Sequence, residues 1–487
     1  MKKNLLYSLL YSMIVAVYPI IMIPYLSQVI GKSGVGTYSY TYSIIAFFLL
    51  VCQLGVDSSG TRAIAKSRDD QVLMTKTFKS IFFIQMLVST ITIICYLIYI
   101  FTVGSEYLFY FLLLLPFLLG QAIRINWFFL GLEQIKTILL RNLVIRLISA
   151  VCIFVFVKSK DSLPLYFIIM SGSSMLGDIS IWPTAWKKFS KDSLDWNLVR
   201  VNIKPMFVMF LPLIALRGSY YIDEIMLGTF HDTDSVGIYE NAYKIVNMPL
   251  QLYTVFANVL TAQASHLVAQ HKEDESVNIL VNSIDLSSSL MIPIIFGLIA
   301  FAKEFVPWYM GTEFIPSIQV MHILPFILIF SGVTSMLRTQ YFIPTEQDNK
   351  YVITIFIGVF INITLNAILI HLFTYVGVAV ASLLAEAIIT IVSVILIQRE
   401  TNILRAFRYF PLYVGCSLVM SVLIRIIGNQ IGVGVKANVI QVTAGILVYF
   451  PLLFIILHIF CKKDPVTIDK IIIKIIKDIR LKLNKKS

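Results

Sequence analysis

Charged residues are scarce in this sequence. Asp, Glu, Lys and Arg make up 14% of its 487 residues, whereas a soluble domain carries roughly 25%. Apolar residues account for 58%, which excludes a disordered chain. Because so few charges cannot cover the surface of a soluble domain, the composition predicts a protein embedded in a lipid bilayer.

The sequence also lacks the motifs of several functional classes. Its five cysteines form no CxxC pair, so neither a disulfide framework nor a zinc site is expected. There is no complete GxxxxGK[ST] motif of an ATP-driven pump, and no HExxH or GxSxG motif of a hydrolase. We therefore expect no enzyme, no cofactor and no metal site. Half of the net charge of +12 lies in residues 462–487, unlike the dense basic face of a nucleic-acid-binding domain.

Long hydrophobic runs dominate what is present. A helix needs about 20 apolar residues to cross the hydrocarbon core of a bilayer, and the first run lacks the cleavage site of a signal peptide. The sequence therefore predicts an all-α polytopic membrane protein with 14 transmembrane helices, near residues 5–29, 36–58, 77–101, 107–130, 138–157, 163–183, 206–230, 236–266, 283–302, 318–341, 351–371, 376–397, 409–427 and 438–461.

The basic residues predict the orientation of these helices. With the N-terminus in the cytoplasm, 28 Lys and Arg fall inside the cell, 6 fall outside and 5 lie within spans. Because short cytoplasmic loops are enriched in Lys and Arg, both termini are expected in the cytoplasm. The tail at 462–487 carries apolar residues at helical spacing. It is expected to be an amphipathic helix on the anionic inner leaflet, the alternative being a solvated tail.

A short internal repeat indicates two similar halves. Residues 34–45 and 235–246 share Val-Gly and two tyrosines at an offset of 201 residues, so that Gly36 matches Gly237. Both copies open the second helix of a six-helix group, which predicts parallel repeats with a substrate path between them. The expected division is an N-terminal lobe at 1–204, a C-terminal lobe at 205–400, two further helices at 401–461 and the tail at 462–487.

Several motifs resemble those of one transporter family. They are GVGTYSYTYSI, GVDSSGTRAIA at 55–65, WFFLGLEQIKTILLRNLVIRLIS at 127–149, DEIMLGTF with SVGIYENAYKI at 223–245, and GVAVASLLAEAI at 377–388. Over residues 5–460 the chain resembles the polysaccharide repeat-unit flippases (Wzx type, for O-antigen or capsule). This family shares the MOP superfamily with the MATE transporters and the lipid II flippases.

The resemblance implies a function. It implies a secondary transporter of the bacterial cytoplasmic membrane, which flips undecaprenyl-pyrophosphate-linked oligosaccharide from the inner to the outer leaflet by alternating access. Membrane lipids would be further partners, as would a polysaccharide polymerase and a chain-length regulator. Two alternatives stay open. A MATE-type multidrug or ion antiporter would favour an acidic cavity for its cationic ligands, and a polysaccharide polymerase would need a larger outer loop.

Five cations fall within predicted spans, where a charge is costly unless it faces water, a partner or a ligand. A lipid pyrophosphate suits them, because guanidinium forks match phosphate oxygens and lysine supplies a point charge. Arg217 is closest to the predicted midplane of its helix. The candidate substrate-binding cations, which could line a central cavity, are Arg217, Lys244, Arg124, Arg146 and Arg338.

These residues also have purely structural alternatives. The last three arginines could extend toward the inner headgroups, whereas Arg217 and Lys244 could pair with nearby carboxylates. Tyr221, one turn from Arg217 on the same helix face, is the candidate sugar contact. The carboxylates, which would otherwise bind a coupling proton or Na⁺, are Asp223, Glu224 and Glu240.

Overall fold

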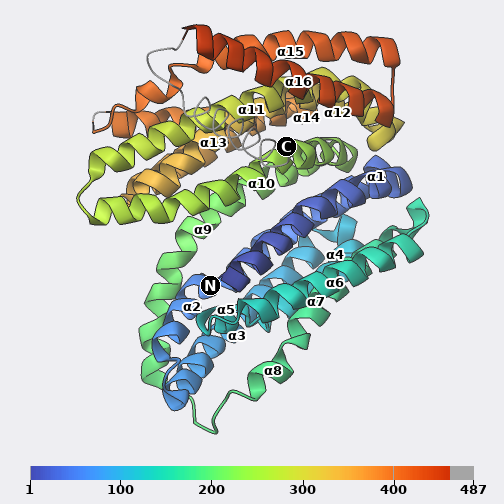
Figure 1. Ribbon diagram of the computed structural model, residues 1–487. Coiled ribbons are helices and arrows are strands. Elements are labelled where there is room, and N and C mark those ends of the chain that lie inside the picture. Colours follow the sequence, from blue (N-terminus) through green and yellow to red (C-terminus); the bar gives the residue numbers. More distant parts are fainter. Residues whose placement is uncertain (1, 399, 461–487) are drawn as a thin grey trace, which may run out of the picture. The chain divides into compact units, whose positions relative to one another are not determined.

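The computed structural model describes residues 2–398 and 400–460, and every element in this part of the chain is helical. The predicted amphipathic tail lies outside the described residues. Figure 1 shows the order of the helices along the chain, whose bounds are α1 (Lys2–Gln53), α2 (Val56–Ser67), α3 (Gln71–Thr102), α4 (Leu108–Ala122), α5 (Asn126–Gly131), α6 (Ile135–Phe156), α7 (Leu163–Ser180), α8 (Trp182–Trp186), α9 (Trp196–Phe230), α10 (Thr233–Ala269), α11 (Glu273–Tyr309), α12 (Ser317–Ile323), α13 (Ile327–Leu337), α14 (Asp348–Gln398), α15 (Phe410–Ile431) and α16 (Val435–Phe460).

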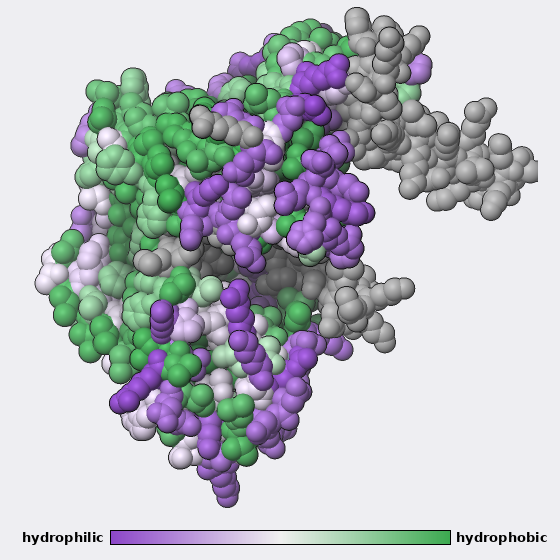
Figure 2. All heavy atoms as spheres, turned by 90° about the vertical axis from the view of Figure 1, so that its left-hand side faces the viewer, coloured by the Kyte–Doolittle hydropathy of each residue, from purple (hydrophilic) through white to green (hydrophobic). Residues whose placement is uncertain are grey.

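The surface has the character of a membrane protein. Within the described residues, 10 helical segments are long and apolar enough to cross a bilayer. Large apolar side chains are exposed along them, as at Val151 of α6 (60%), Phe360 of α14 (71%) and Leu447 of α16 (66%). Figure 2 shows broad hydrophobic areas on the face that it draws. In water such a surface would be unfavourable, so these faces are expected to contact lipid.

The long helices α1 and α14 each contain a residue with a non-helical backbone. Gly31 in α1 has φ 69° and ψ −178°, and Thr374 in α14 has φ 51°. Gly31 falls between the predicted spans 5–29 and 36–58, and Thr374 falls between 351–371 and 376–397. A residue without a Cβ is favoured at the positive φ of Gly31. Each long helix thus divides where two spans were predicted to meet, while the total of 14 stays a prediction.

The predicted span at 107–130 corresponds to one candidate span at Ser105–Gly131, although its helix is interrupted. Here α4 ends at Ala122 and the short α5 begins at Asn126. The amide of Gln85, on α3, donates to the carbonyl oxygens of Gln121 (3.2 Å), Ala122 (2.9 Å) and Arg124 (2.9 Å). The last carbonyl oxygens of α4 lack the amide that a continuing helix would offer, and Gln121 O accepts from Arg124 N at 3.3 Å. The break is therefore stabilised by a side chain that hydropathy does not identify.

The chain forms two compact units, Met1–Glu240 and Asn241–Ser487. In the first unit α4 packs against α1 and α7, and α9 packs against α1 and α3. In the second unit α11 packs against α13, α15 and α16. Helix α10 begins in the first unit and continues into the second. The predicted division at 204, 400 and 461 stays a proposal.

An aromatic core occupies the first unit where α2, α3, α5 and α8 meet. Trp127, Phe128 and Phe129 are at most 1% exposed. The rings of Trp127 and Phe128 contact Phe78 of α3, and Phe129 contacts Phe128. Burying aromatic side chains in offset and edge contacts is strongly stabilising. This core holds the loop between α4 and α5 in place, next to the polar cluster described below.

Candidate functional site

Three buried carboxylates lie where α9 meets α10 in the first unit. Asp223, Glu224 and Glu240 are 4%, 2% and 4% exposed. The hydroxyl of Tyr239 donates to Asp223 (3.1 Å), that of Tyr220 donates to Glu240 (2.6 Å), and that of Ser43 on α1 donates to Glu224. Hydroxyl donors stabilise a buried carboxylate, so these predicted site residues also join α1, α9 and α10.

Tyr221 lies in a group of aromatic rings beside these carboxylates. Its ring centroid is 6.4 Å from that of Tyr42 and 6.1 Å from that of Phe47, both on α1. Tyr42 in turn stacks on Tyr38 at 5.7 Å and meets Phe117 of α4 at 5.5 Å. Tyr38, Tyr42 and Tyr221 are only partly buried. Partly exposed tyrosines offer an apolar face and a hydroxyl, which suits contact with a sugar.

Arg124 lies in the break between α4 and α5, at the edge of a polar cluster. Its Nε is 3.4 Å from Asp178 Oδ1, on α7, and its Nη1 donates to Gln121 Oε1 at 3.0 Å. Asp178 is 4% exposed. A second arginine, Arg141 of α6, reaches the same carboxylate oxygen at 3.9 Å. Two guanidinium groups therefore share one buried carboxylate.

The other candidate cations have different surroundings. Arg146 of α6 lies over the ring of Tyr18 at 4.9 Å, and Arg338 lies over the ring of Tyr351 at 5.6 Å. Such cation–π contacts are common structural roles for arginine. Lys244, on α10, is partly buried. Arg217 is in the middle of α9, but its side chain lies outside the described residues.

The five cations are divided between the two units. Arg124, Arg146 and the α9 position of Arg217 belong to the first unit, and Lys244 and Arg338 belong to the second. The first unit brings Tyr221 together with Asp223, Glu224 and Glu240. A common cavity for all five cations stays a prediction. No group of three or more potential metal ligands occurs among the residues that were described.

The two glycines of the internal repeat meet within the first unit. A Cβ atom on Gly36 would lie 1.6 Å from the Thr233 carbonyl oxygen, and one on Gly237 would lie 2.2 Å from the Lys32 carbonyl oxygen. Lys32 and Asp234 form a partly exposed ion pair of 3.1 Å beside this contact. The main chains of α1 and α10 therefore touch at the matched motifs, which explains the glycine in each copy.

The second unit contains a different polar cluster between α11, α15 and α16. Glu304 is 3% exposed and accepts from Arg425 (3.3 Å) and from Gln441 Nε2 (3.2 Å). Gln441 also donates to the carbonyl oxygen of Ile424 at 3.1 Å. Arg425 lies inside α15. One cation and one carboxylate are matched here.

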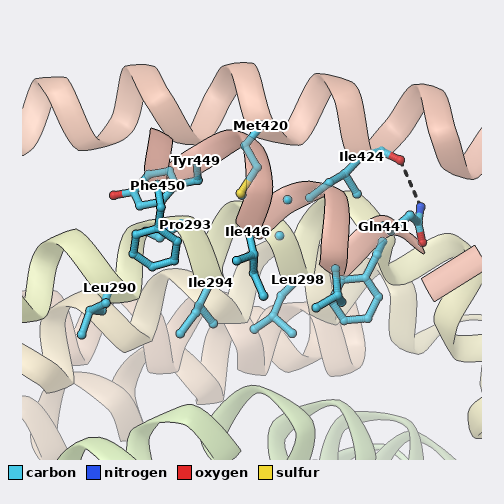
Figure 3. Close-up of a pocket in the computed structure, with 14 residues that line it drawn as sticks. Leu290, Pro293, Ile294, Leu298, Met420, Ile424, Gln441, Ile446, Tyr449 and Phe450 are labelled. Atoms are coloured by element: carbon cyan, nitrogen blue, oxygen red, sulfur yellow. Dashed lines mark hydrogen bonds between the residues drawn. The ribbon is translucent and has the colours of Figure 1, made fainter. Parts of the chain in front are cut away.

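An apolar cavity of about 330 Å³ adjoins this second cluster. Figure 3 shows Leu290, Ile294 and Leu298 of α11 on one side, and Met420 and Ile424 of α15 on the other. Pro293 of α11 and the α16 residues Gln441, Ile446, Tyr449 and Phe450 complete the lining that the view labels. A cavity lined almost entirely by apolar side chains suits a hydrocarbon ligand.

A family model described as "Polysaccharide biosynthesis protein" matches residues 1–261, which is more than half of the chain. The chain belongs to this family. A second model, described as "Lipid II flippase MurJ", matches residues 187–432. The predicted membership among polysaccharide flippases of the MOP superfamily is thereby confirmed.

Two curated relatives match most of this chain. The putative O-antigen transporter of Shigella dysenteriae is 24% identical over 404 residues, 80% of this chain and 98% of that protein. The one of Escherichia coli strain K12 is 23% identical over 385 residues, 76% of this chain and 90% of that protein. The solved lipid II flippase MurJ, in an inward closed conformation, has a TM-score of 0.74 at 16% identity and covers 93% of this chain and 99% of its own. The all-helical polytopic membrane fold is therefore confirmed.

The motifs at 55–65 and 127–149 have a structural role in this chain. Gly60 of GVDSSGTRAIA lies against the ring of Trp127, where a Cβ would be 2.7 Å from a ring carbon. Gly131 likewise lies against Ile64, at 2.7 Å. Outside this contact, Arg68 pairs with Glu133 at 2.6 Å. The two motifs therefore pack α2 on α5.

Sequence reasoning missed three residues of the first cluster. Arg141 was not among the candidate cations, but it lies within α6 with a side chain only 11% exposed. Asp178 lies in the predicted span 163–183, but it was not among the candidate carboxylates. Gln85 was not singled out at all. In the sequence, each of these residues could be noticed only as a polar residue inside an apolar run. The structure was needed to show that the three runs lie close together.

Proposed function

We propose that this protein flips undecaprenyl-pyrophosphate-linked oligosaccharide repeat units from the inner to the outer leaflet of a bacterial cytoplasmic membrane. The main support for this proposal is the sequence similarity to a protein named as a putative O-antigen transporter. The similarity extends over 98% of that protein. The MurJ-like fold supports it. The sugars of the repeat unit, and whether they enter capsule or O-antigen, would be read from the lipid that accumulates without the protein.

The charged side chains within helices support a site for the pyrophosphate. In this proposal Arg217, Arg124, Arg146, Lys244 and Arg338 contact the substrate at some stage of transport. Arginine suits phosphate because its planar fork donates two parallel hydrogen bonds. Tyr221 and its neighbouring rings would contact sugars. The apolar cavity of the second unit would receive a hydrocarbon segment of the polyprenyl chain, since its lining is almost free of polar atoms.

Transport is proposed to be secondary and to proceed by alternating access. The sequence has no complete nucleotide-binding motif, so flipping should continue in vesicles without ATP. The buried Asp223, Glu224 and Glu240 are proposed to bind a coupling proton or Na⁺. Carboxylates held in low dielectric by hydroxyl groups can gain or lose a proton as their surroundings change.

The deciding experiment uses purified protein in sealed vesicles that contain a fluorescent undecaprenyl-pyrophosphate disaccharide. We expect the labelled headgroup to appear in the opposite leaflet without ATP, as measured by a membrane-impermeant quencher. Protein-free vesicles give the background rate. Movement of a cationic dye in place of the lipid would favour the multidrug-exporter alternative, and a chain-extended glycan product would favour the polymerase alternative.

The proposed topology has 14 spans with both termini in the cytoplasm. A reporter that is active only outside the cytoplasm should be silent when fused after Lys463 and active when inserted at 233–236. The reverse result would refute the topology. A polymerase and a chain-length regulator are proposed as neighbours in the membrane, to be detected by crosslinking in intact cells.

A further inference from the structure

The cluster of Arg124, Asp178 and Arg141 has an unequal number of opposite charges. Asp178 Oδ1 lies 3.4 Å from Arg124 Nε and 3.9 Å from Arg141 Nη1. Asp178 and Arg141 have side chains that are 5% and 11% exposed, whereas Arg124 is 35% exposed. The Asp178 carboxylate thus faces two guanidinium groups, of which that of Arg124 is accessible, while the carboxylate of Asp57 also interacts with Asp178 electrostatically.

Neutral polar groups fix this arrangement without adding charge. Arg141 Nη2 donates to Asn126 Oδ1 (2.9 Å) and Asn142 Oδ1 (2.7 Å). Arg124 Nη1 donates to Gln121 Oε1. Gly120 of α4 lets α7 approach, since a Cβ there would be 3.3 Å from Asp178 Oδ2. The three charged side chains are therefore held together by contacts from α4, α5, α6 and α7.

The break at residues 123–125 places Arg124 in this cluster. Gln85 holds the last carbonyls of α4 and that of Arg124, while Trp127 Nε1 donates to Gln85 Oε1 at 3.0 Å. Gln85 is 2% exposed and Trp127 is 1% exposed. A buried amide whose donors and acceptor are all used is a rigid support. Arg124 is consequently fixed at its backbone and is free to exchange partners through its side chain.

A carboxylate and a phosphate bind guanidinium through the same geometry, so they compete for the same N–H groups. We propose that Asp178 is a built-in competitor for the diphosphate of the substrate. When the lipid diphosphate arrives, Arg124 leaves Asp178 and contacts a phosphate, while Arg141 stays with the carboxylate. When the substrate leaves, Asp178 takes Arg124 back. This inference rests on the proposed function and adds a release step to it.

The proposal makes opposite predictions for the two kinds of side chain. Arg124→Gln removes a ligand of the diphosphate and should weaken binding by roughly tenfold to a hundredfold. Asp178→Asn removes the competitor and should bind the diphosphate more tightly, roughly tenfold. Because release then becomes slower, the same variant should flip its substrate more slowly. A residue that only stabilises the fold would not raise affinity when it is removed.

The test measures binding of a fluorescent prenyl diphosphate to the full chain in nanodiscs of phosphatidylcholine. Comparison with binding of the matching prenyl alcohol shows whether the protein recognises the phosphates. Addition of phosphatidylglycerol shows whether ordinary anionic headgroups occupy the site instead. We expect tight binding of the diphosphate, little binding of the alcohol and weak competition by phosphatidylglycerol. Equal binding of alcohol and diphosphate, or full displacement by phosphatidylglycerol, would overturn the proposal.

Glu304→Gln in the second unit is the matched control, since Glu304 is a buried carboxylate paired with one arginine. It should lower the melting temperature and leave diphosphate affinity unchanged. If Asp178→Asn does not fold, Arg124→Gln decides, because Asp178 then still has Arg141. Normal melting with weaker binding supports the proposal, and unchanged binding refutes it. Wild-type flipping is measured separately, so failure of the proposed function is distinguishable from failure of this inference.

Discussion

Two buried ion clusters, one in each unit, differ in their balance of charge. In the second unit Glu304 meets Arg425, and the amide of Gln441 completes the contacts. In the first unit Asp178 is shared by Arg124 and Arg141. A matched pair satisfies itself and joins helices, whereas a shared carboxylate leaves one arginine able to exchange partners. The difference separates a structural contact from a candidate ligand site.

The residues around each cluster support this difference between a structural contact and a candidate ligand site. Arg425 also donates to the carbonyl oxygen of Ala300 at 3.3 Å, and Gln441 donates to Ile424, so the second cluster ties α11, α15 and α16 together. Gly428 makes room for it, since a Cβ there would lie 2.3 Å from Gln441 Nε2. The first cluster instead lies at a helix break. A break can present a side chain that a continuous helix would carry elsewhere.

The largest effect is expected from breaking the matched pair. Glu304→Leu leaves the Arg425 guanidinium without its carboxylate, which in buried pairs costs about 3–5 kcal/mol. Because Arg425 is 38% exposed, we expect about 3 kcal/mol. The measurement is the free energy of unfolding in detergent. The double variant Glu304→Leu with Arg425→Leu should recover most of the lost unfolding free energy. If it recovers none, the two residues do not act as an isolated ion pair.

Substitution of Arg217 tests whether this cation belongs to a matched ion pair or binds the substrate. If it binds pyrophosphate, Arg217→Ala should abolish flipping while the protein still inserts. Losing one charge-assisted contact costs about 1.5–3 kcal/mol. Arg217→Lys should keep part of the activity, since charge remains but the fork is lost. Recovery of protein level and transport by adding Glu224→Ala would show a matched pair instead, so both quantities are measured in all variants.

Substitution of Gln85 tests whether its hydrogen bonds hold the backbone of Arg124 in position. Gln85→Leu leaves buried carbonyls and the Trp127 N–H without this partner, at a cost of about 1–3 kcal/mol. Flipping should fall as well, because Arg124 is no longer held at its backbone. Thr90→Val, on the exposed side of the same helix, is the control and should change neither value. A loss of stability with normal flipping would mean that the break does not position Arg124.

The smallest effect is expected at the ion pair between Lys32 and Asp234. Lys32 and Asp234 are partly exposed, and exposed ion pairs contribute about 0–1 kcal/mol. Lys32→Gln should therefore leave the unfolding free energy almost unchanged. Gly36→Val, at the adjacent main-chain contact, should cost more, since its Cβ would meet the Thr233 carbonyl oxygen. Equal effects from the two changes would contradict close contact of the main chains.

Much of the fold was predictable because it depends on local hydrophobicity. The division of α1 at Gly31 and of α14 at Thr374 agrees with gaps between predicted spans. The break after Ala122 was not found, because residues on both sides of it are apolar and a window of about 20 residues averages across it. Gln85, which stabilises that break, is 37 residues away from Ala122.

The candidate site was predictable only as a set of residue types. Arg124 and the carboxylates Asp223, Glu224 and Glu240 were identified because polar groups inside apolar runs need a reason to be there. Arg141 escaped notice because a cation near a predicted helix end resembles a loop residue. The role of the motif WFFLGLE also needed the structure, since its three aromatic rings fill a core rather than contact a ligand.

The amino-acid sequence by itself determined that this chain is a helical membrane protein of the polysaccharide flippase family. A backbone in hydrocarbon must satisfy its own hydrogen bonds, so long apolar runs leave helices as the one solution available to them. Only the tertiary structure decided which buried charges share a partner. Arg124 and Asp178 are 54 residues apart, and nothing in the local sequence brings α4, α6 and α7 to the same point. Helix packing does so, and it leaves Asp178 between two arginines while Glu304 has one.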